Sequence, residues 1–406
     1  DSNPNEPPPK CKHKVSRQVG YGLLLELAKD NQDTWKLAIQ KLLAHHETCS
    51  VPQSWNYYPS TLVKSPCGYV GLQNLGATCY MNSLLQQLYM IPNFRCGILS
   101  LPHDDESTHG SFVFQFKRLF GFLQESAKRY YETKQFCESY SDNFNPTIQM
   151  DADEFFAMLF DRLETVTKDT PQATLLRDIF GGTVCNQVIS KECEHVSERQ
   201  EPFYSLSVTV KGKSSLEESL ELYVEGDMLE GDNKYQCSKC DKKVTALKRC
   251  CIESLPNTLI VHMKRFEFDL EEMRRMKVND HCKFPFDLNV EPYTKEGLAR
   301  REAEADNRDT QPRPHPDSYY QYELAGILVH TGTADSGHYY SFIKNRKGYQ
   351  WYQFNDTFVD TFDKGDIPRQ CFGGYETKSY DNSVRARINN AYMLFYQRKE
   401  PVETKT

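Results

Sequence analysis

The sequence predicts an α+β protein, with a helical first half and a strand-rich second half. Up to about Phe180, apolar residues recur three, four and seven positions apart, which is the spacing of one buried face of a helix. Beyond Phe180, apolar residues gather in short alternating or β-branched runs, which are typical of strands. The length of 406 residues allows two or three units around one or more sizeable cores.

The N-terminal region differs from the rest. Residues 1–14 are polar and Pro-rich, and are expected to be a disordered leader. Residues 15–66 are expected to hold a helical segment, with Asp33 and Thr34 as candidate caps, followed by a linker. This segment either packs on the main body or ends a helical array. Because the chain opens on Asp1 rather than Met, we expect a fragment of a larger multidomain protein.

The main body is expected to span residues 67–400 and to begin with helices. Helical spacing is formed by three sets of residues: Met81, Leu84, Leu85, Leu88 and Tyr89; Phe112, Phe116, Leu119, Phe120 and Leu123; Phe155, Phe156, Leu159, Phe160 and Leu163. Strands are predicted near residues 203–210, 259–263, 322–330, 338–343 and 391–396. Residues 292–318 are expected to form a poorly ordered loop, and residues 269–277 a solvated loop or helix face.

Composition excludes several classes of function. Lys and Arg number 49 against 56 Asp and Glu, a net charge of −7. This charge gives no overall basic surface that would bind the phosphates of nucleic acid, so nucleic-acid binding is a poor first hypothesis. We find no apolar run near the ~20 residues that cross a bilayer, and so expect no membrane insertion. The 14 scattered cysteines favour reduced thiols, in the cytoplasm or nucleus, over a disulfide framework.

Cys79 is the first candidate for chemistry, because it follows a Gly-containing turn and starts a predicted helix. The thiolate is the nucleophilic form of cysteine, and the free amides of a helix N-terminus favour it. Asn74, on the incoming turn, could donate a hydrogen bond to a developing oxyanion. Each residue also has an ordinary interpretation, Cys79 as a small core residue and Asn74 as a turn former.

A cysteine nucleophile also needs a base whose second ring nitrogen is oriented by an acceptor. Of the 11 histidines, His338 suits this role best, since it follows Gly337 and begins a strand-like aromatic run. Asn355 and Asp356 end a second strand-like run, at a spacing that suits a neighbouring antiparallel strand. The alternative for His338 is a core histidine at a strand start.

Five segments together carry a family resemblance. They are GLQNLGATCYMNSLLQQL at residues 71–88, QMDADEF at 149–155, LIVHMKRFEF at 259–268, GHYYSF at 337–342 and WYQFND at 351–356. In order and spacing they resemble the boxes of the ubiquitin-specific proteases, and among these the very large multidomain members. The resemblance implies a papain-like cysteine protease fold. Its parts would be a helical thumb at residues 71–178, a β-rich fingers insertion at 179–254, an antiparallel palm at 255–399 and a tail at 401–406.

The resemblance also implies hydrolysis of the isopeptide or peptide bond after the C-terminal glycine of ubiquitin, with no cofactor required for catalysis. Ubiquitin and ubiquitinated proteins are the implied partners. By position, Cys79 becomes the nucleophile, His338 the general base and Asn74 the oxyanion donor. Asn355 becomes the third member where many relatives carry Asp, so it can orient His338 without a full negative charge. Asp356 next to it could share that role.

Acidic residues before the third helical set are expected to bind the substrate tail. Asp151 and Glu154 match the pair with which family members bind the arginines of the ubiquitin tail, and Tyr339 is expected to line the same slot. Carboxylates suit arginines, and only glycines fit beside a buried thiolate. The ordinary interpretation of Asp151, Asp153 and Glu154 is charge that complements a helix dipole, and both can hold.

An incomplete metal site is formed by three cysteines, Cys193, Cys237 and Cys240. Cys237 and Cys240 have the spacing of a zinc knuckle. In the other knuckle, aligned by resemblance, Ser190 stands in the place of the partner of Cys193. A structural zinc would need Cys185 or His195 as a substitute ligand; otherwise the site is degenerate and empty.

Two other functions remain open. One is a catalytically inactive scaffold that binds ubiquitin, against which the intact set of Cys79, His338 and Asn355 argues. The other is a protease for a different ubiquitin-like modifier. Asp151 and Glu154 favour a modifier with arginines in its tail, as ubiquitin has.

Overall fold

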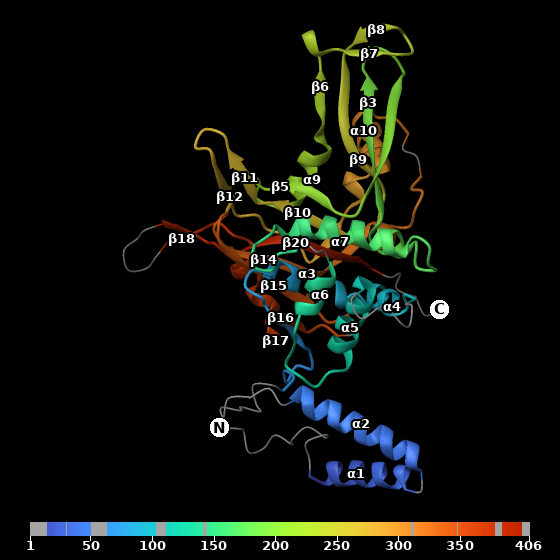
Figure 1. The fold of residues 1–406 in the computed structure, drawn as a ribbon. Helices are drawn as coiled ribbons and strands as arrows, with labels where there is room; N and C mark the ends of the chain where they lie inside the picture. The colour runs from blue at the N-terminus through green and yellow to red at the C-terminus, as the bar shows by residue number, and fades with distance from the viewer. Residues whose placement is uncertain are drawn as a thin grey trace, which may run out of the picture.

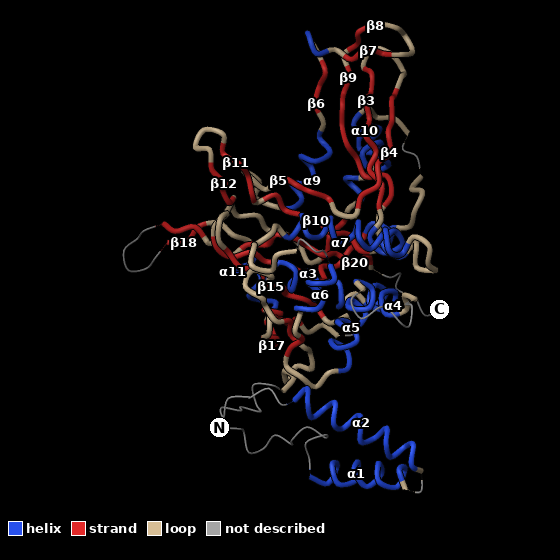
Figure 2. Tube along the Cα trace, viewed as in Figure 1, coloured by secondary structure: helices blue, strands red, loops and turns tan. Residues whose placement is uncertain are grey.

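The computed structural model describes residues 14–29, 31–49, 63–102, 111–140, 144–309, 312–346, 348–377 and 384–399. Apart from Lys14, the leader expected at residues 1–14 lies outside the described residues, as do most of the expected linker and the tail at 401–406. In the described part, helices precede strands, and the α+β class is confirmed (Figure 2).

Six helices of the described chain form one side of the body (Figure 1). They are α3 (Cys79–Tyr89), α4 (Pro92–Leu99), α5 (Phe112–Glu125), α6 (Lys134–Tyr140), α7 (Ala152–Thr167) and α8 (Leu175–Phe180). The three helices predicted from apolar spacing are α3, α5 and α7, and all three are confirmed. In α5, Ser111 caps the N-terminus and the rings of Phe116 and Phe120 meet edge to face, 4.8 Å apart. Every residue of α3 is buried, so this helix forms the centre of the body.

An eight-stranded sheet, here called the palm sheet, packs against α3. Its strands are β5 (Leu206–Thr209), β10 (Thr258–Lys264), β13 (Asp287–Asn289), β14 (Gln321–Gly332), β15 (Gly337–Lys344), β16 (Trp351–Asn355), β17 (Phe358–Phe362) and β20 (Asn390–Arg398). They run in the order β17-β16-β15-β14-β20-β10-β5, with β13 also paired to β14. Ser341 Oγ on β15 donates to the Ser83 carbonyl of α3 at 3.0 Å, which ties sheet and helix together.

A second sheet of four strands projects away from the body (Figure 1). Its order is β4-β3-β9-β6, formed by β3 (Gly182–Ser190), β4 (Val196–Phe203), β6 (Asp227–Leu229) and β9 (Ala246–Ser254). The hairpin of β7 (Tyr235–Cys237) and β8 (Lys242–Val244) lies at its far end. We call this sheet and hairpin the fingers sheet.

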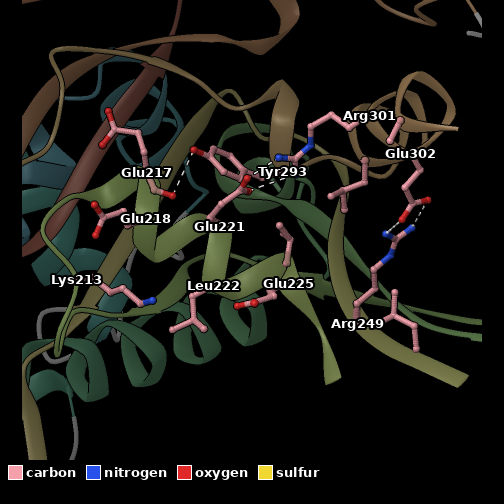
Figure 3. Close-up of a pocket in the computed structure, with 14 residues that line it drawn as sticks. Lys213, Glu217, Glu218, Glu221, Leu222, Glu225, Arg249, Tyr293, Arg301 and Glu302 are labelled. Carbon is pink, nitrogen blue, oxygen red and sulfur yellow. Dashed lines mark hydrogen bonds and ion pairs between the residues drawn. The ribbon is translucent and has the colours of Figure 1, made fainter. Parts of the chain in front are cut away.

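Two helices, α9 (Leu216–Glu225) and α10 (Lys295–Ala305), pack against β9 of the fingers sheet (Figure 1). Figure 3 shows the side chains of this region. Glu302 of α10 pairs with Arg249 of β9, whose side chain is only 6% exposed. Arg301 of α10 donates to Glu221 of α9 at 2.5 Å. These ion pairs fix α10 to both neighbours and line one side of an open pocket of about 890 Å³.

Two sequence predictions in this region are wrong. Residues 292–318, expected to be a poorly ordered loop, contain α10, because Thr294 caps Gly297 N at 3.1 Å and Leu298 is buried. Residues 269–277, expected to be a loop or helix face, belong to a hairpin of β11 (Phe266–Asp269) and β12 (Arg274–Lys277). Strand pairing satisfies the backbone there, while most of its side chains stay exposed.

Short elements complete the body: β1 (Gly71–Leu72), β2 (Tyr130–Tyr131), β18 (Tyr375–Thr377), β19 (Val384–Ala386), α11 (Ile367–Cys371), and 3-10 turns at Gly231–Asn233, Glu291–Tyr293, Asp317–Tyr320 and Lys364–Asp366. None of the helices in the described ranges is long and apolar enough to cross a membrane.

Two N-terminal helices, α1 (Lys14–Ala28) and α2 (Gln32–Cys49), pack against each other (Figure 1). Asn31 caps α2 by accepting from Asp33 N and Thr34 N, so the caps expected at those two residues were wrong. Asn is as good a cap as Asp, so the composition of this turn did not single out the right residue. Whether the pair ends a helical array stays a prediction.

Candidate active site

A tight turn before α3 positions Cys79. Asn74 Oδ1 accepts hydrogen bonds from Gly76 N at 2.9 Å and Thr78 N at 3.1 Å. Gly76 has a φ of +128°, which favours glycine, and Leu75 N donates a hydrogen bond to Thr78 Oγ1 at 3.0 Å. The chain then enters α3 at Cys79, which is 2% exposed. The sequence placed Cys79 at a helix start, and this placement is confirmed.

The structure brings Cys79, His338 and Asn355 together. His338 lies on β15 and Asn355 ends β16, its antiparallel neighbour, as the spacing predicted. His338 Nε2 donates to Asn355 Oδ1 at 2.7 Å, and the ring also hydrogen-bonds with the Cys79 thiol. The imidazole thus has the thiol on one side and a fixed acceptor on the other, the arrangement that a cysteine nucleophile requires.

Asp356 connects the turn, the helix and the imidazole. Its carboxylate accepts from Asn74 Nδ2 at 3.0 Å and from Asn82 Nδ2 at 2.8 Å. Its nearer oxygen lies 3.9 Å from His338 Nε2, outside hydrogen-bond distance. Asp356 therefore supplies charge beside the ring and holds Asn74, while Asn355 makes the direct contact.

The surroundings of His338 favour its protonated form. The hydrogen bond with Cys79, the bond to Asn355 and the charge of Asp356 raise the pKa of His338 from 6.5 to about 9, against the opposing effect of burial. The imidazole therefore carries a proton at neutral pH, ready to be given to a leaving group.

The expected tail-binding residues lie at the start of α7. Asp151 caps this helix by accepting from Asp153 N at 2.8 Å, and it also accepts from Tyr392 Oη at 2.5 Å. Glu154, on the first turn, is exposed. Tyr339 is 2% exposed and hydrogen-bonds with the backbone at the start of α7, so it lies beneath this region instead of lining an open slot.

The three predicted metal ligands lie together at the far end of the fingers sheet. The sulfurs of Cys193, Cys237 and Cys240 are 3.2 to 3.8 Å apart. His195 Nδ1 lies 3.2 Å from Cys237 Sγ, beside the three thiols but outside the group whose ligand atoms all lie within 4.8 Å of one another. Cys185, the other expected substitute ligand, lies in β3, where its backbone carbonyl accepts a hydrogen bond from the Cys251 thiol. Three thiols and an imidazole are a donor set that suits tetrahedral zinc.

Sequence reasoning missed two residues of the site. Asn82 lies three positions after Cys79, on the same face of α3, but α3 also holds the buried polar residues Ser83, Gln86 and Gln87, so its spacing from Cys79 was the one signal available. Tyr392 reaches Asp151 from β20, 241 positions away in sequence, and no local pattern could have indicated this contact.

Comparisons with known proteins show the family to which this chain belongs. Residues 70–396 match the profile of a family described as "Ubiquitin carboxyl-terminal hydrolase". The chain is 37% identical to human ubiquitin carboxyl-terminal hydrolase 34 and 39% identical to human ubiquitin carboxyl-terminal hydrolase 24, over 97% and 96% of its length. It is 35% identical to the Drosophila melanogaster probable ubiquitin carboxyl-terminal hydrolase FAF, over 97% of its length.

The chain spans only 12%, 16% and 16% of the lengths of these three relatives. The family match nevertheless covers most of the chain and includes both Cys79 and His338. The chain therefore belongs to the ubiquitin carboxyl-terminal hydrolase family of cysteine-type deubiquitinases, whose α+β papain-like catalytic domain it contains.

Proposed function

We propose that this protein hydrolyses the isopeptide or peptide bond that follows the C-terminal glycine of ubiquitin. The observation that carries the proposal is His338, which bonds to both Cys79 and Asn355 and has a pKa of about 9. A thiolate beside a protonated imidazole is a pair that can attack an acyl carbon and protonate the departing amine.

The reaction follows from these contacts. The Cys79 thiolate attacks the carbonyl carbon, and the oxyanion is held by amides at the start of α3 and by Asn74 Nδ2. Asn74 Nδ2 carries two hydrogens; one bonds to Asp356 and the other is free for the oxyanion. His338 protonates the leaving lysine amine, which leaves a thioester on Cys79. Neutral His338 then takes a proton from water, and hydroxide attack releases ubiquitin.

Replacing Cys79 with Ala tests this function. The variant should release no fluorescent amine from a ubiquitin C-terminal amide reporter, while its circular dichroism spectrum and melting temperature match those of the wild type. Turnover by the variant would contradict the assignment. A wild-type protein that binds ubiquitin but cleaves neither this reporter nor one with another modifier's tail would indicate the inactive scaffold instead.

The tail of ubiquitin is proposed to approach Cys79 from the start of α7. Asp151 and Glu154 lie at the start of α7, and their carboxylates would pair with the arginines of the tail. Gln149 Nε2 donates to the Gly337 carbonyl at 3.2 Å, which joins the segment before α7 to the start of β15 beside His338. The same two regions would thus hold the tail and the general acid.

We also propose a structural zinc held by Cys193, Cys237, Cys240 and His195. Hydrogen bonds with Ser190 and within the group lower the pKa of Cys193 to about 7, while the bonds to Cys193 and Cys237 raise the pKa of Cys240 to about 12, so the first ionisation of the linked thiols falls on Cys193. Zinc there would stabilise the far end of the fingers sheet and take no part in catalysis.

Zinc content measured on purified protein tests this site. We expect about one zinc per chain, lost in Cys240→Ser, and a lower melting temperature after chelation. Cys250→Ser, which removes a thiol of β9 outside the cluster, should keep its zinc. Zinc-free wild-type protein that melts at the same temperature with and without added zinc would contradict the proposal.

A reducing compartment, cytoplasm or nucleus, is proposed as the setting. The reaction needs a free thiol at Cys79, and the twelve cysteines from Cys67 to Cys371 are unbridged. Ubiquitin and ubiquitinated proteins are the proposed partners.

A further inference from the structure

A pocket of about 520 Å³ lies at the β17 edge of the palm sheet. Lys64 and Arg129 line one part of it, and Gln353, Asn355 and Asp360 line another. The segment carrying Lys64 is fixed in place, because Ser65 Oγ donates to the Val359 carbonyl at 2.6 Å and Val63 pairs with Lys128. The pocket wall is therefore built from elements already tied to the sheet.

The pocket shares one residue with the candidate active site. Asn355 lines it and also accepts the 2.7 Å hydrogen bond from His338 Nε2. The pocket is therefore one side chain away from the imidazole that would protonate the leaving amine.

Strand order places this pocket on the side of the reaction opposite the proposed ubiquitin tail. Asp151, one of the proposed tail carboxylates, is held from β20 through Tyr392, and its neighbour Asp153 is held from β10, where His262 Nδ1 lies 3.3 Å from the Asp153 carboxylate. His338 and Asn355 follow on β15 and β16, and the pocket adjoins β16 and β17. A tail that runs from α7 to Cys79 therefore directs its leaving group toward the pocket.

The pocket lining has more positive than negative side chains, with Lys64 and Arg129 against Asp360. Among the described residues, neither Lys64 nor Arg129 forms an ion pair with a carboxylate. The Arg129 guanidinium lies 4.1 Å from the centre of the Phe358 ring, which leaves its edges open to a ligand. Asp360, the one carboxylate of the lining, already accepts from Thr361 N at 2.7 Å. The lining thus holds two cations and one carboxylate, and carries a net positive charge.

We propose that this pocket is the acceptor subsite: it binds the segment of the modified protein that carries the isopeptide-linked lysine, and favours acidic side chains beside that lysine. This inference rests on the proposed deubiquitinase function. A partly exposed ion pair contributes modestly, so two of them correspond to a preference of about threefold to tenfold.

The test compares two conjugates in which ubiquitin is joined to the lysine of a short peptide, flanked by Glu in one and by Lys in the other. The wild type should cleave the Glu conjugate with a kcat/KM about threefold to tenfold higher. Lys64→Gln and Arg129→Gln should each lower this ratio, and the double variant should bring it near one. Lys128→Gln removes a neighbouring exposed cation outside the lining and should keep the wild-type ratio. Asp360→Asn should raise the ratio, and added salt should lower it.

A ratio near one in the wild type, or a ratio unchanged in the double variant, would overturn the acceptor subsite. Each ratio compares two conjugates cleaved by the same protein, so a general loss of activity cancels. A ubiquitin amide reporter without a peptide separates the two proposals. If the wild type cleaves this reporter but shows no peptide preference, only the subsite fails; if the reporter is not cleaved, the proposed function fails and the subsite with it.

Discussion

His338 and its neighbours divide two tasks between adjacent residues. Asn355 orients the ring through a direct hydrogen bond but carries no charge. Asp356 carries the charge, 3.9 Å from the ring nitrogen, and uses both carboxylate oxygens on Asn74 and Asn82. Its φ of +47° turns the chain sharply after β16, so that the two side chains serve different partners. With an amide at position 355, the negative charge beside His338 is therefore kept, since the next residue supplies it.

The pH dependence of activity should report this arrangement. The pKa of His338 is raised to about 9, so kcat/KM should fall as pH rises through that value and the proton is lost. Asp356→Asn removes a charge that raises the pKa, and should move this alkaline limb to lower pH. Asp161→Asn, on the exposed face of α7, is the control and should leave the limb in place. A limb that stays near pH 9 in Asp356→Asn would argue against an electrostatic role of this carboxylate.

At the scale of elements, α10 illustrates how a short cap decides a structure. Residues 295–305 are rich in Glu, Arg and Ala, which favour a helix. Leu298 is the one larger apolar residue of this helix, and it is buried. The apolar pattern is therefore too weak to predict a helix. Thr294 starts it, and the pairs with Arg249 and Glu221 hold it against β9 and α9.

Removal of this cap should be measurable. Thr294→Ala leaves Gly297 N without its acceptor and should lower the free energy of unfolding by about 1 kcal/mol in urea denaturation. Thr294→Ser keeps the hydroxyl and should retain most of the stability. Equal stability of the wild type and Thr294→Ala would show that the ion pairs alone hold the helix.

On the scale of the whole molecule, the candidate site lies where the helical side meets the palm sheet. Cys79 and Asp151 come from helix N-termini, and His338, Asn355 and Tyr392 come from strands. The bond from Tyr392 to Asp151 joins the two sides where the ubiquitin tail is proposed to bind. The proposed binding of the tail would therefore depend on the packing of the two halves, and the proposed chemistry on α3 and β15.

A conservative change at this junction should separate binding from chemistry. Tyr392→Phe removes the donor to Asp151 and should raise KM for a ubiquitin reporter about threefold to tenfold, while kcat changes less than about twofold. Tyr396→Phe, on the same strand, loses a bond to the Pro285 carbonyl instead and should leave KM unchanged. A fall in kcat with constant KM in Tyr392→Phe would show that this contact acts on the reacting groups.

Much of the fold could be predicted because its causes are local. The helices α3, α5 and α7 and the palm strands β5, β10, β14, β15 and β20 follow from apolar spacing within a few turns or one strand length, whereas β13 and β17 were not predicted. The start of α3 at Cys79 follows from the turn around Gly76, and the pairing of β15 with β16 follows from the short connection between them. The hairpin at residues 266–277 was missed, because its charged residues carry no strand pattern and its backbone pairing does not depend on them.

The sequence by itself determined which groups could do chemistry: a cysteine at a helix start, a histidine at a strand start, and an amide and a carboxylate at the next strand end. Tertiary structure alone decided how these groups share their hydrogen bonds. Asn82 and Asn74 meet Asp356 across more than 270 positions, and Tyr392 meets Asp151 across 241. Such contacts depend on how the palm sheet packs on the helices, and no periodicity within one element encodes that packing.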